Sequence, residues 1–366
     1  MKTDAAVIYE EGGPFTIESV EIEPPQDDEI LVEIAGVGFC HTDVLARDQH
    51  TPTRLPAVLG HEGAGVVQEV GDAVTSIEPG DSVVLSFDYD DQCPNCNQGD
   101  VAYCEGFFPH NFIGRRPSDG SSPLSKGDET ISGRFFGQSS FAQHAIATER
   151  NAVKVPDDAP LELLGPLGCG IQTGAGGVIN ALNAQAGSSI VIFGAGSVGL
   201  SGLLGANVKG CSEKVVVDIQ QSRLEKAEQL GATNVINPNK VDDVGEAIRE
   251  YLDGGVDYSL EATGDPSVLR QAVDVLQQGG TCGVAGAPPV GTEVSLEVNT
   301  ILAGREIRGI TIGDAHPKEF IPDLIDLYQD GQFPFDELIT LYDFENIEQA
   351  VEDQKSGEVI KPVLTM

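Results

Sequence analysis

The segment from residue 189 to residue 218 constrains the fold of this chain more than any other. Ser189–Phe193 is a short apolar run typical of a buried strand, and Gly194-Ala-Gly196-Ser-Val-Gly199 follows it directly. A helix-compatible run begins at Leu200, and a second apolar run ends just before Asp218. Strand, glycine-rich turn, helix and strand in this order predict a doubly wound parallel α/β sheet.

Each glycine of this turn has a physical task. Gly194 permits a tight turn, Gly196 lets a pyrophosphate approach the backbone, and Gly199 allows close helix–strand packing. The helix N-terminus offers unpaired N–H groups to phosphates. Asp218 is placed to accept hydrogen bonds from ribose hydroxyls and to repel a 2′-phosphate, which favours NAD over NADP. An ordinary glycine-rich turn is the alternative, but the complete context favours a dinucleotide site.

The remainder of the chain divides by pattern. The first 150 or so residues hold short alternating runs between Gly and Pro turns, which predict a β-rich domain. Within it, the polar stretch from Ser118 to Gly133 predicts a long surface loop. From about residue 171, apolar strands alternate with helical segments. An amphipathic helix around Pro322–Gln329 and a closing strand near Ile360–Leu364 are predicted at the end.

The charge of the chain is strongly negative: 58 acidic and 21 basic residues give −37. Such a surface repels itself in dilute buffer, whereas at roughly molar salt the Debye length falls to about 3 Å. We interpret this as salt adaptation of the halophilic kind, and the same charge disfavours nucleic acid and anionic membranes as partners.

The cellular location of the protein is predicted from two further features. No run approaches the roughly 20 apolar residues that a spanning helix needs, and the N-terminal residues do not resemble a signal peptide. The seven cysteines are an odd number, and four have metal-like spacing, which favours a reducing compartment. A cytoplasmic location is expected.

Three residues predict a metal site. Cys40 opens Cys-His-Thr-Asp, His61 lies in Gly-His-Glu-Gly twenty residues later, and Cys169 precedes the α/β half. Two thiolates and an imidazole form a Cys₂His set that suits catalytic zinc with a fourth position open. Singly, each is weak evidence, because a buried cysteine usually behaves as a small hydrophobic residue.

The flanks of these residues resemble a known family. GVGFCHTD, LPAVLGHEGAGVV, GPLGCGIQTGAG and SGEVIKPVLTM are similar to medium-chain zinc alcohol dehydrogenases, and RDQHTPTRLPAVLGHEG, SGRFFGQSSFAQHAI and GQFPFDELITLY resemble their aryl-alcohol (benzyl-alcohol) branch. The resemblance covers nearly the whole chain. It implies a GroES-like catalytic domain over residues 1–170 and 311–366, a Rossmann NAD-binding domain over 171–310, and a dimeric or tetrameric enzyme.

The resemblance also implies roles for individual residues. Cys40, His61 and Cys169 would hold the catalytic zinc, with Glu62 behind the metal. Asp43 would orient the ring of His61, and Thr42 would accept the alcohol proton. Four positions match residues near the cofactor: His41 and Lys361 at the pyrophosphate, Arg223 at the adenosine ribose and Thr173 at the nicotinamide. For His41, Lys361 and Arg223 an ordinary solvated charge is the alternative.

Two positions depart from the family pattern. Leu45 stands where many members have a histidine that ends the proton relay, and His50 is the nearest histidine downstream. The family's structural zinc lobe has four cysteines, whereas this chain supplies Asp90, Cys93, Cys96 and Cys104. Because zinc accepts carboxylate oxygen, we expect either a Cys₃Asp zinc site or a lobe that has lost its metal.

Several other residues fit structural roles better. His110, His144 and His316 lack ligand-like neighbours, and Cys211 and Cys282 lie at or beside apolar strands. The pairs Phe107-Phe108 and Phe135-Phe136 suit either a substrate pocket or the core.

The expected reaction is oxidation of a primary, aromatic alcohol to an aldehyde, with hydride transfer to NAD. A zinc-dependent polyol or sugar dehydrogenase would instead need several placed polar groups in its pocket. A catalytically silent NAD-binding protein is the alternative from another class, since fold alone does not guarantee chemistry.

Overall fold

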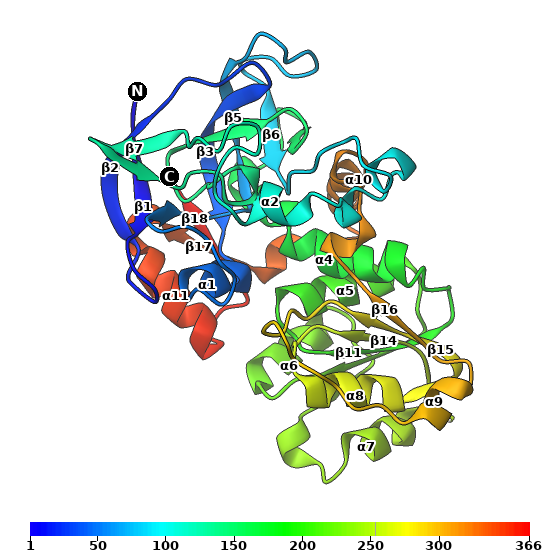
Figure 1. The fold of residues 1–366 in the computed structure, drawn as a ribbon. Helices are drawn as coiled ribbons and strands as arrows, with labels where there is room; N and C mark the ends of the chain where they lie inside the picture. Colours follow the sequence, from blue (N-terminus) through cyan, green and yellow to red (C-terminus); the bar gives the residue numbers. More distant parts are fainter. Residues whose placement is uncertain (253) are drawn as a thin grey trace. The chain divides into compact units, whose positions relative to one another are not determined.

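The computed structural model describes residues 1–252 and 254–366 and divides them into two compact units. Residues 1–169, 316–323 and 339–366 form the first unit, and residues 170–315 and 324–338 form the second (Figure 1). Residues 170, 311–315 and 324–338 were predicted to lie in the first domain, whereas they belong to the second unit.

The second unit is built on one parallel sheet of six strands. Its spatial order is β13-β12-β11-β14-β15-β16, which in chain order reads 3-2-1-4-5-6, the doubly wound arrangement predicted from the glycine-rich segment. The order reverses between β11 and β14, and ligands of such sheets bind beyond the carboxyl ends of the strands at this point. The strands are β11 (Ser189–Phe193), β12 (Glu213–Val217), β13 (Asn234–Ile236), β14 (Val256–Glu261), β15 (Leu276–Val284) and β16 (Glu306–Gly309).

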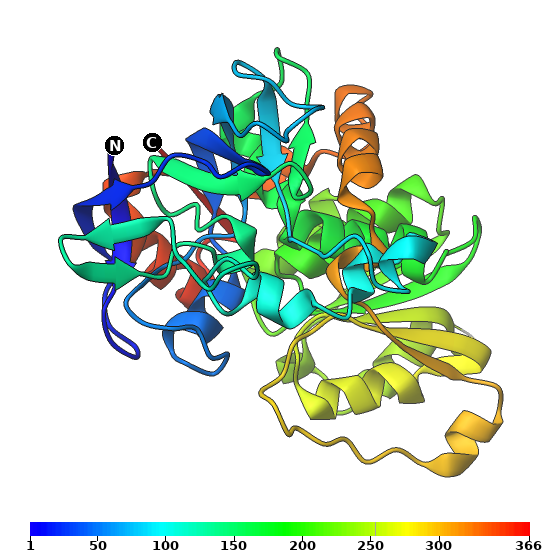
Figure 2. The same ribbon diagram turned by 45° about the horizontal axis from the view of Figure 1, so that its top comes forward.

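Helices cover both faces of this sheet (Figures 1 and 2). Asp243 and Asp265 cap two of them by accepting backbone N–H groups of the first turn, and Pro266 occupies the first turn of α8, where its missing N–H costs nothing. The helices are α4 (Gly170–Gly176), α5 (Ser197–Val208), α6 (Gln221–Gln229), α7 (Val244–Tyr251), α8 (Pro266–Asp274) and α9 (Val298–Leu302).

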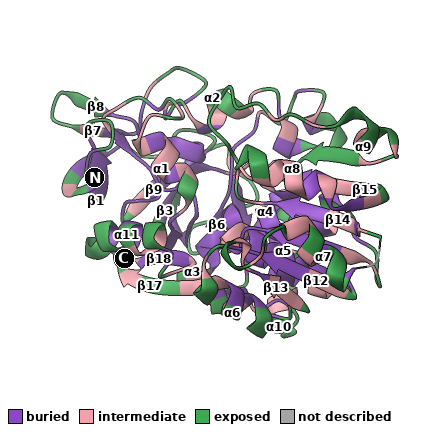
Figure 3. Cartoon of the chain, turned by 90° about the horizontal axis from the view of Figure 1, so that it is seen from below, coloured by how far each residue is buried: buried purple, intermediate pink, exposed green. Residues whose placement is uncertain are grey.

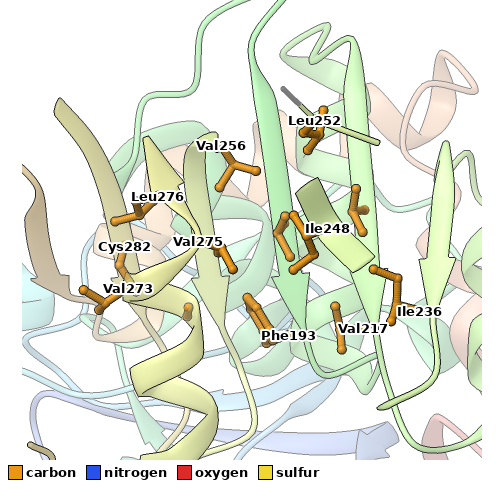
Figure 4. Packing of buried hydrophobic residues seen from close by; sticks show 13 residues of the cluster. Phe193, Val217, Ile236, Ile248, Leu252, Val256, Val273, Val275, Leu276 and Cys282 are labelled. Carbon is orange, nitrogen blue, oxygen red and sulfur yellow. The ribbon is translucent and has the colours of Figure 1, made fainter. Parts of the chain in front are cut away.

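The core of the second unit explains why its strands read as continuous apolar runs. Phe193 and Val217 project from the sheet, and Ile248 of α7 and Val273 of α8 pack onto the same cluster (Figure 4). Colouring by burial shows the central strands buried and the outward faces of the helices exposed (Figure 3). A strand covered on both faces needs apolar side chains on both.

The first unit contains two largely antiparallel sheets. The larger has the order β10-β6-β5-β3-β18-β17, with β9 also paired to β3, and the smaller has the order β4-β1-β2-β7-β8. The closing strand β18 pairs with β3, so the C-terminal segment completes the N-terminal sheet. The strands are β1 (Lys2–Ile8), β2 (Thr16–Ile22), β3 (Glu29–Gly38), β4 (Ala57–Val58), β5 (Gly63–Val70), β6 (Ser82–Leu85), β7 (Leu124–Lys126), β8 (Glu129–Ile131), β9 (His144–Thr148), β10 (Ala152–Lys154), β17 (Ile339–Asp343) and β18 (Lys361–Thr365).

The sequence predicted a long surface loop from Ser118 to Gly133, and this prediction is wrong in part. This stretch contains the β7–β8 hairpin, whose strands pair Leu124 with Ile131. The alternation is too short to be visible in a polar sequence, and pairing with β2 supplies the missing stabilisation.

Five further α-helices lie within the part of the chain that the structure describes. They are α1 (His41–Arg47), α2 (Phe107–Asn111), α3 (Leu161–Leu164), α10 (Pro317–Gln329) and α11 (Ile347–Ser356). The predicted amphipathic helix around residue 322 is the second half of α10, which therefore begins earlier than expected. Within the residues described, no helix combines the length and apolar character needed to cross a membrane.

Candidate metal and cofactor sites

The residues predicted to hold a metal come together in the first unit. The ligand atoms of Cys40, His61, Glu62 and Cys169 all lie within 4.8 Å of one another. Cys40 precedes α1, whereas His61 and Glu62 precede β5. Three segments that are distant in sequence therefore meet at one point.

The ring of His61 is held in one orientation by Asp43. The Nδ1 atom lies 2.9 Å from Oδ1 of Asp43, which also accepts the N–H of Gly60 at 3.0 Å, while Oδ2 accepts the N–H of Cys40 at 3.0 Å. Both Asp43 and His61 are fully buried. Burial opposes charge on the ring, but the Asp43 carboxylate outweighs it and raises the pKa of His61 to about 10.

The other nitrogen of this ring carries the evidence for a metal. Nε2 of His61 is buried and has no hydrogen-bond partner. Burying a polar atom without a hydrogen-bond partner costs desolvation free energy, so such an atom indicates that a ligand binds there. With two thiols and this nitrogen converging, the residues fit zinc: Cys₂His with an open position is a catalytic donor set.

The two thiols differ in their acidity. The hydrogen bond with Cys169 holds the pKa of Cys40 well below its usual value, although burial opposes this, and the charge of Lys361 acts in the same direction as Cys169. The same hydrogen bond, together with burial, raises the pKa of Cys169. Thiolate is the metal-binding form of cysteine, and the metal itself would complete the deprotonation of the pair.

Glu62 lies beside the cluster with a partner that the sequence did not predict. Nζ of Lys361 is 2.6 Å from Oε2 of Glu62 and donates to the carbonyl of Phe39 at 3.1 Å. Both charged side chains are fully buried. A side chain on Gly38 would meet Oε2 of Glu62 at 2.0 Å, so only glycine fits there. The predicted contact of Lys361 is with the cofactor pyrophosphate, whereas its amine here is bonded to Glu62 and Phe39.

Gln138 is a further residue that sequence reasoning missed. Its Nε2 donates to the carbonyls of His61 and Ser86, and its Oε1 accepts the N–H of Gly63. It therefore fixes the backbone on both sides of Glu62. No local pattern distinguishes such a glutamine from a surface one, because its role depends entirely on tertiary contacts.

Aromatic rings pack directly on the metal cluster. The ring of Phe136 lies 4.6 Å from that of His61, and Phe112 lies 5.1 Å from Phe136. Phe136 has a positive φ of 52°, an unfavourable conformation for a bulky residue. Phe135 is buried as well, whereas Phe108 is exposed. The Phe135-Phe136 pair is thus part of the wall around His61.

The residues next to Cys40 differ in exposure. Thr42 is half-buried, with its Oγ1 3.8 Å from Sγ of Cys40. His41 is exposed, as is His50, and Leu45 is half-buried. Thr42 is thus the hydroxyl nearest the cluster in this segment.

The second predicted metal cluster also assembles. The ligand atoms of Asp90, Cys93, Cys96 and Cys104 lie within 4.8 Å of one another. Oδ1 of Asp90 accepts the N–H groups of Gln92 and Cys93 at 2.8 and 2.9 Å, and the N–H of Asp90 lies 3.3 Å from Sγ of Cys104. Because Oδ1 of Asp90 already accepts these two backbone hydrogen bonds, Oδ2 is the oxygen that can bind a metal. Three thiols and one carboxylate fit zinc.

The glycine-rich turn of the second unit has the predicted geometry. Gly194 has φ of 96°, and a Cβ on Gly199 would stand 1.7 Å from the carbonyl oxygen of Gly194. Around Gly196, the cap of α5, the space is open. Asp218 follows β12 and accepts the N–H groups of Ala195 at 2.6 Å and Gln220 at 2.7 Å. Asp218 thus also supports the turn that it was predicted to accompany.

Two more predicted cofactor residues lie in this unit. Arg223, on α6, has a buried Nε without a hydrogen-bond partner. Thr173, on α4, is buried. An unpaired guanidinium nitrogen beside the second strand is compatible with the predicted position near the adenosine ribose.

The residues assigned structural roles have partners typical of such roles. Nδ1 of His110 lies 3.1 Å from Asp88, and Nδ1 of His144 lies 3.2 Å from Thr3. His316 contacts the ring of Tyr89. Cys211 and Cys282 are buried, and burial raises the pKa of Cys282 to about 11.

Comparison with known proteins identifies the family of the chain. The alcohol dehydrogenase GroES-like domain family matches residues 26–157, and the zinc-binding dehydrogenase family matches residues 197–330. The chain is 46% identical to geraniol dehydrogenase of Castellaniella defragrans, over all of this chain and 98% of that protein.

Solved structures give the same result. Benzyl alcohol dehydrogenase from Acinetobacter calcoaceticus is 48% identical with a TM-score of 0.96, covering 100% of this chain and 99% of that one. An alcohol dehydrogenase zinc-binding domain protein from Burkholderia ambifaria is 50% identical with a TM-score of 0.97, at the same coverage. The chain therefore belongs to the zinc-dependent medium-chain alcohol dehydrogenase family.

Proposed function

We propose that this enzyme oxidises primary aromatic and allylic alcohols to aldehydes with NAD. The observation that carries this proposal is the convergence of Cys40, His61 and Cys169 within 4.8 Å, with an unpaired Nε2 on His61. Support for the substrate class comes from the aromatic wall of Phe136 and Phe112 beside His61. It also comes from relatives named benzyl alcohol and geraniol dehydrogenase.

The residues around the cluster have distinct parts in this reaction. Cys40, His61 and Cys169 would hold zinc, whose contribution is Lewis acidity that makes an alcohol hydroxyl more acidic. Asp43 fixes the tautomer of His61, and Thr42 would accept the proton of the alcohol while passing its own hydroxyl proton on towards solvent. The buried rings of Phe135 and Phe136 beside His61 would limit the access of water to a bound alcohol.

The choice of NAD rests on Asp218. Its carboxylate stands at the end of β12, beside the turn at Gly194 and Gly196, where it would accept ribose hydroxyls and repel a 2′-phosphate. NAD supplies the hydride acceptor. Arg223 and Thr173, both in the second unit, are proposed to complete the cofactor site.

The lobe of Asp90, Cys93, Cys96 and Cys104 is proposed to hold a second, structural zinc. All four positions are occupied by donors, so the site is closed, as structural zinc sites are.

A second copy of this chain is the partner we infer. Strand β16 is the outer strand of its sheet, and exposed apolar side chains gather in the segment leading to it: Val290, Val298, Leu302 and Ile307. An open, apolar sheet edge is a ready surface for association. Light scattering of Leu302→Glu, which should lower the mass relative to the parent, tests this.

The seven free cysteines and the charge of −37 support a reducing, saline interior such as a cytoplasm.

The proposed metal is tested by Cys40→Ser, with Cys211→Ser as a control that removes a buried thiol outside the cluster. Cys40→Ser should lose one zinc per subunit and all turnover yet keep NADH binding, because the glycine-rich turn lies in the other unit. Cys211→Ser should keep all three. Turnover by metal-free Cys40→Ser would refute the assignment.

The substrate class is tested by a panel of benzyl alcohol, geraniol, ethanol, sorbitol and glucose with NAD. Benzyl alcohol and geraniol should give kcat/KM at least tenfold above the others. Preference for sorbitol or glucose would indicate a polyol dehydrogenase, and NADH binding without zinc-dependent turnover would indicate a silent protein.

A further inference from the structure

Two buried hydroxyl residues outside the metal and dinucleotide sites, Thr53 and Ser132, pack beside Gly114. A Cβ on Gly114 would lie 2.9 Å from Cβ of Ser132 and 3.7 Å from Cγ2 of Thr53, so three separate segments converge there. Arg115 follows Gly114, and Arg54 follows Thr53. Backbone bridges between Gly114 and Arg134 and between Ala57 and Ser132 hold these segments together.

The polar atoms of this cluster lack partners. Oγ1 of Thr53, Oγ of Ser132 and Nε of Arg115 are buried and make no hydrogen bond. Thr53 and Ser132 are only 3% and 1% exposed. Buried hydroxyls normally bond to a nearby carbonyl, as Ser139 does with Val58 in the same unit. Two of these atoms belong to residues that pack on Gly114 and the third to the residue that follows it, and all three can donate to an acceptor.

The charges of the cluster are unbalanced as well. Within the described part of the chain, arginine ion pairs are made by Arg47, Arg116, Arg134, Arg150, Arg270 and Arg308. Arg116 binds Glu29 and Glu23, whereas its neighbour Arg115 has neither. Burial lowers the pKa of Arg115, and the positive charge of Arg54 lowers it further.

Two like charges without a carboxylate are unexpected in a chain with 58 acidic residues. A guanidinium fork matches an oxyanion with two parallel N–H···O bonds, and hydroxyls can donate to the same oxygens.

We infer that Arg54, Arg115, Thr53 and Ser132 form a binding site for a small oxyanion, of the carboxylate or phosphate class. Arg115 supplies the buried guanidinium edge, the hydroxyls of Thr53 and Ser132 donate from the floor, and the exposed Arg54 closes over the anion from solvent. The bound anion satisfies the unpaired donors and separates the two positive charges. The site is independent of the proposed reaction, since none of its residues belongs to the metal or cofactor sites.

The experiment measures saturable anion binding to the full chain in molar KCl, where the repulsion from the net charge is screened. Benzoate, acetate and phosphate are titrated separately by calorimetry, and the midpoint of urea unfolding is followed at constant ionic strength. An anion that binds only the native state raises the midpoint with its concentration. Stronger binding of benzoate than phosphate would identify a carboxylate ligand, and the reverse would identify a phosphate.

Variants locate the site. Arg54→Gln, an exposed change that should not disturb folding, is expected to weaken binding about tenfold, and Arg115→Gln should weaken it more. Arg54→Glu should abolish binding, because an internal carboxylate then occupies the guanidinium of Arg115. Arg249→Gln, on α7, removes the same charge elsewhere and should leave the affinity unchanged.

Three results would overturn the inference. These are no saturable binding of any of the three anions, equal affinity in Arg54→Glu and the parent, or equal weakening by Arg249→Gln. The last would mean that the anions respond only to net charge. Since turnover is not the readout, failure here leaves the proposed alcohol dehydrogenase activity untouched.

Discussion

Nζ of Lys361 lies 2.6 Å from Oε2 of Glu62, and neither side chain reaches solvent. This pair sits against a cluster that already contains the thiols of Cys40 and Cys169. Burial lowers the pKa of Lys361, but Glu62 outweighs it and the net pKa is raised, so the amine stays charged. Lys361 thus offsets negative charge beside the metal ligands and holds Glu62 in a fixed position.

Lys361→Met should destabilise the protein by about 3–5 kcal/mol, because it leaves the Glu62 carboxylate buried without its cation. Urea unfolding measures this loss. Adding Glu62→Gln removes the orphaned charge, so the double variant should recover part of the stability. If the two single effects simply add, the ion pair is not coupled and this interpretation fails.

Asp43→Asn should weaken zinc binding about 10–100-fold, since the amide cannot hold the Nδ1–H tautomer of His61 as the carboxylate does. Competition with a chelator measures the zinc affinity. Asp48→Asn is the matched control: it changes an aspartate that pairs with Arg47, away from the cluster. Equal zinc affinity in Asp43→Asn and the parent would show that Asp43 does not position the ligand.

The carboxylate of Asp90 accepts backbone hydrogen bonds and is also proposed to bind zinc, and substitutions can separate these two roles. Asp90→Asn keeps an oxygen that can accept the N–H groups of Gln92 and Cys93 but loses the anionic donor. Zinc per subunit should therefore fall from two to one while turnover is initially retained. Asp90→Cys should bind zinc more tightly than the parent, because thiolate is the softer ligand. One zinc per parent subunit, purified without chelator, would instead mean that the lobe is empty.

Asp218→Asn should lower the preference for NAD over NADP by at least about tenfold, or about 1.4 kcal/mol. The amide no longer repels a 2′-phosphate and still has an acceptor for the backbone beside Gly194. Ratios of kcat/KM for the two cofactors give the preference, with Glu225→Gln on the exposed face of α6 as control. A parent that already prefers NADP would contradict the role given to Asp218.

The parts of the fold that the sequence predicted are those set by local pattern. Strand β11 was predicted with its observed bounds because Ser189–Phe193 is a short apolar run that ends at a glycine with positive φ. Cys40, His61 and Cys169 were predicted as one set because their flanking motifs are short and specific, and the structure brings their ligand atoms within 4.8 Å of one another. In each case, residues adjacent in sequence determine the local structure or identify the motif.

The parts that were missed depend on distant partners. The β7–β8 hairpin is polar and gains its place through pairing with β2. The ion pair of Lys361 joins residues 299 positions apart, and Gln138 reaches the carbonyl of His61 across 77. No local signal distinguishes these side chains from solvated ones, since their roles exist only after the sheets have formed.

Stability and activity should both rise from low salt to molar KCl. With 58 acidic and 21 basic residues, self-repulsion acts over about 10 Å at 0.1 M salt and about 3 Å at 1 M. The buried pairs, such as Lys361 with Glu62, are screened much less, so the gain should come from the exposed acids. Urea unfolding in KCl and in equal concentrations of sucrose separates the two causes, because sucrose strengthens burial without screening charge. A protein that is most stable below 0.1 M salt, or that gains equally from sucrose, would show that repulsion between the exposed carboxylates does not limit its stability.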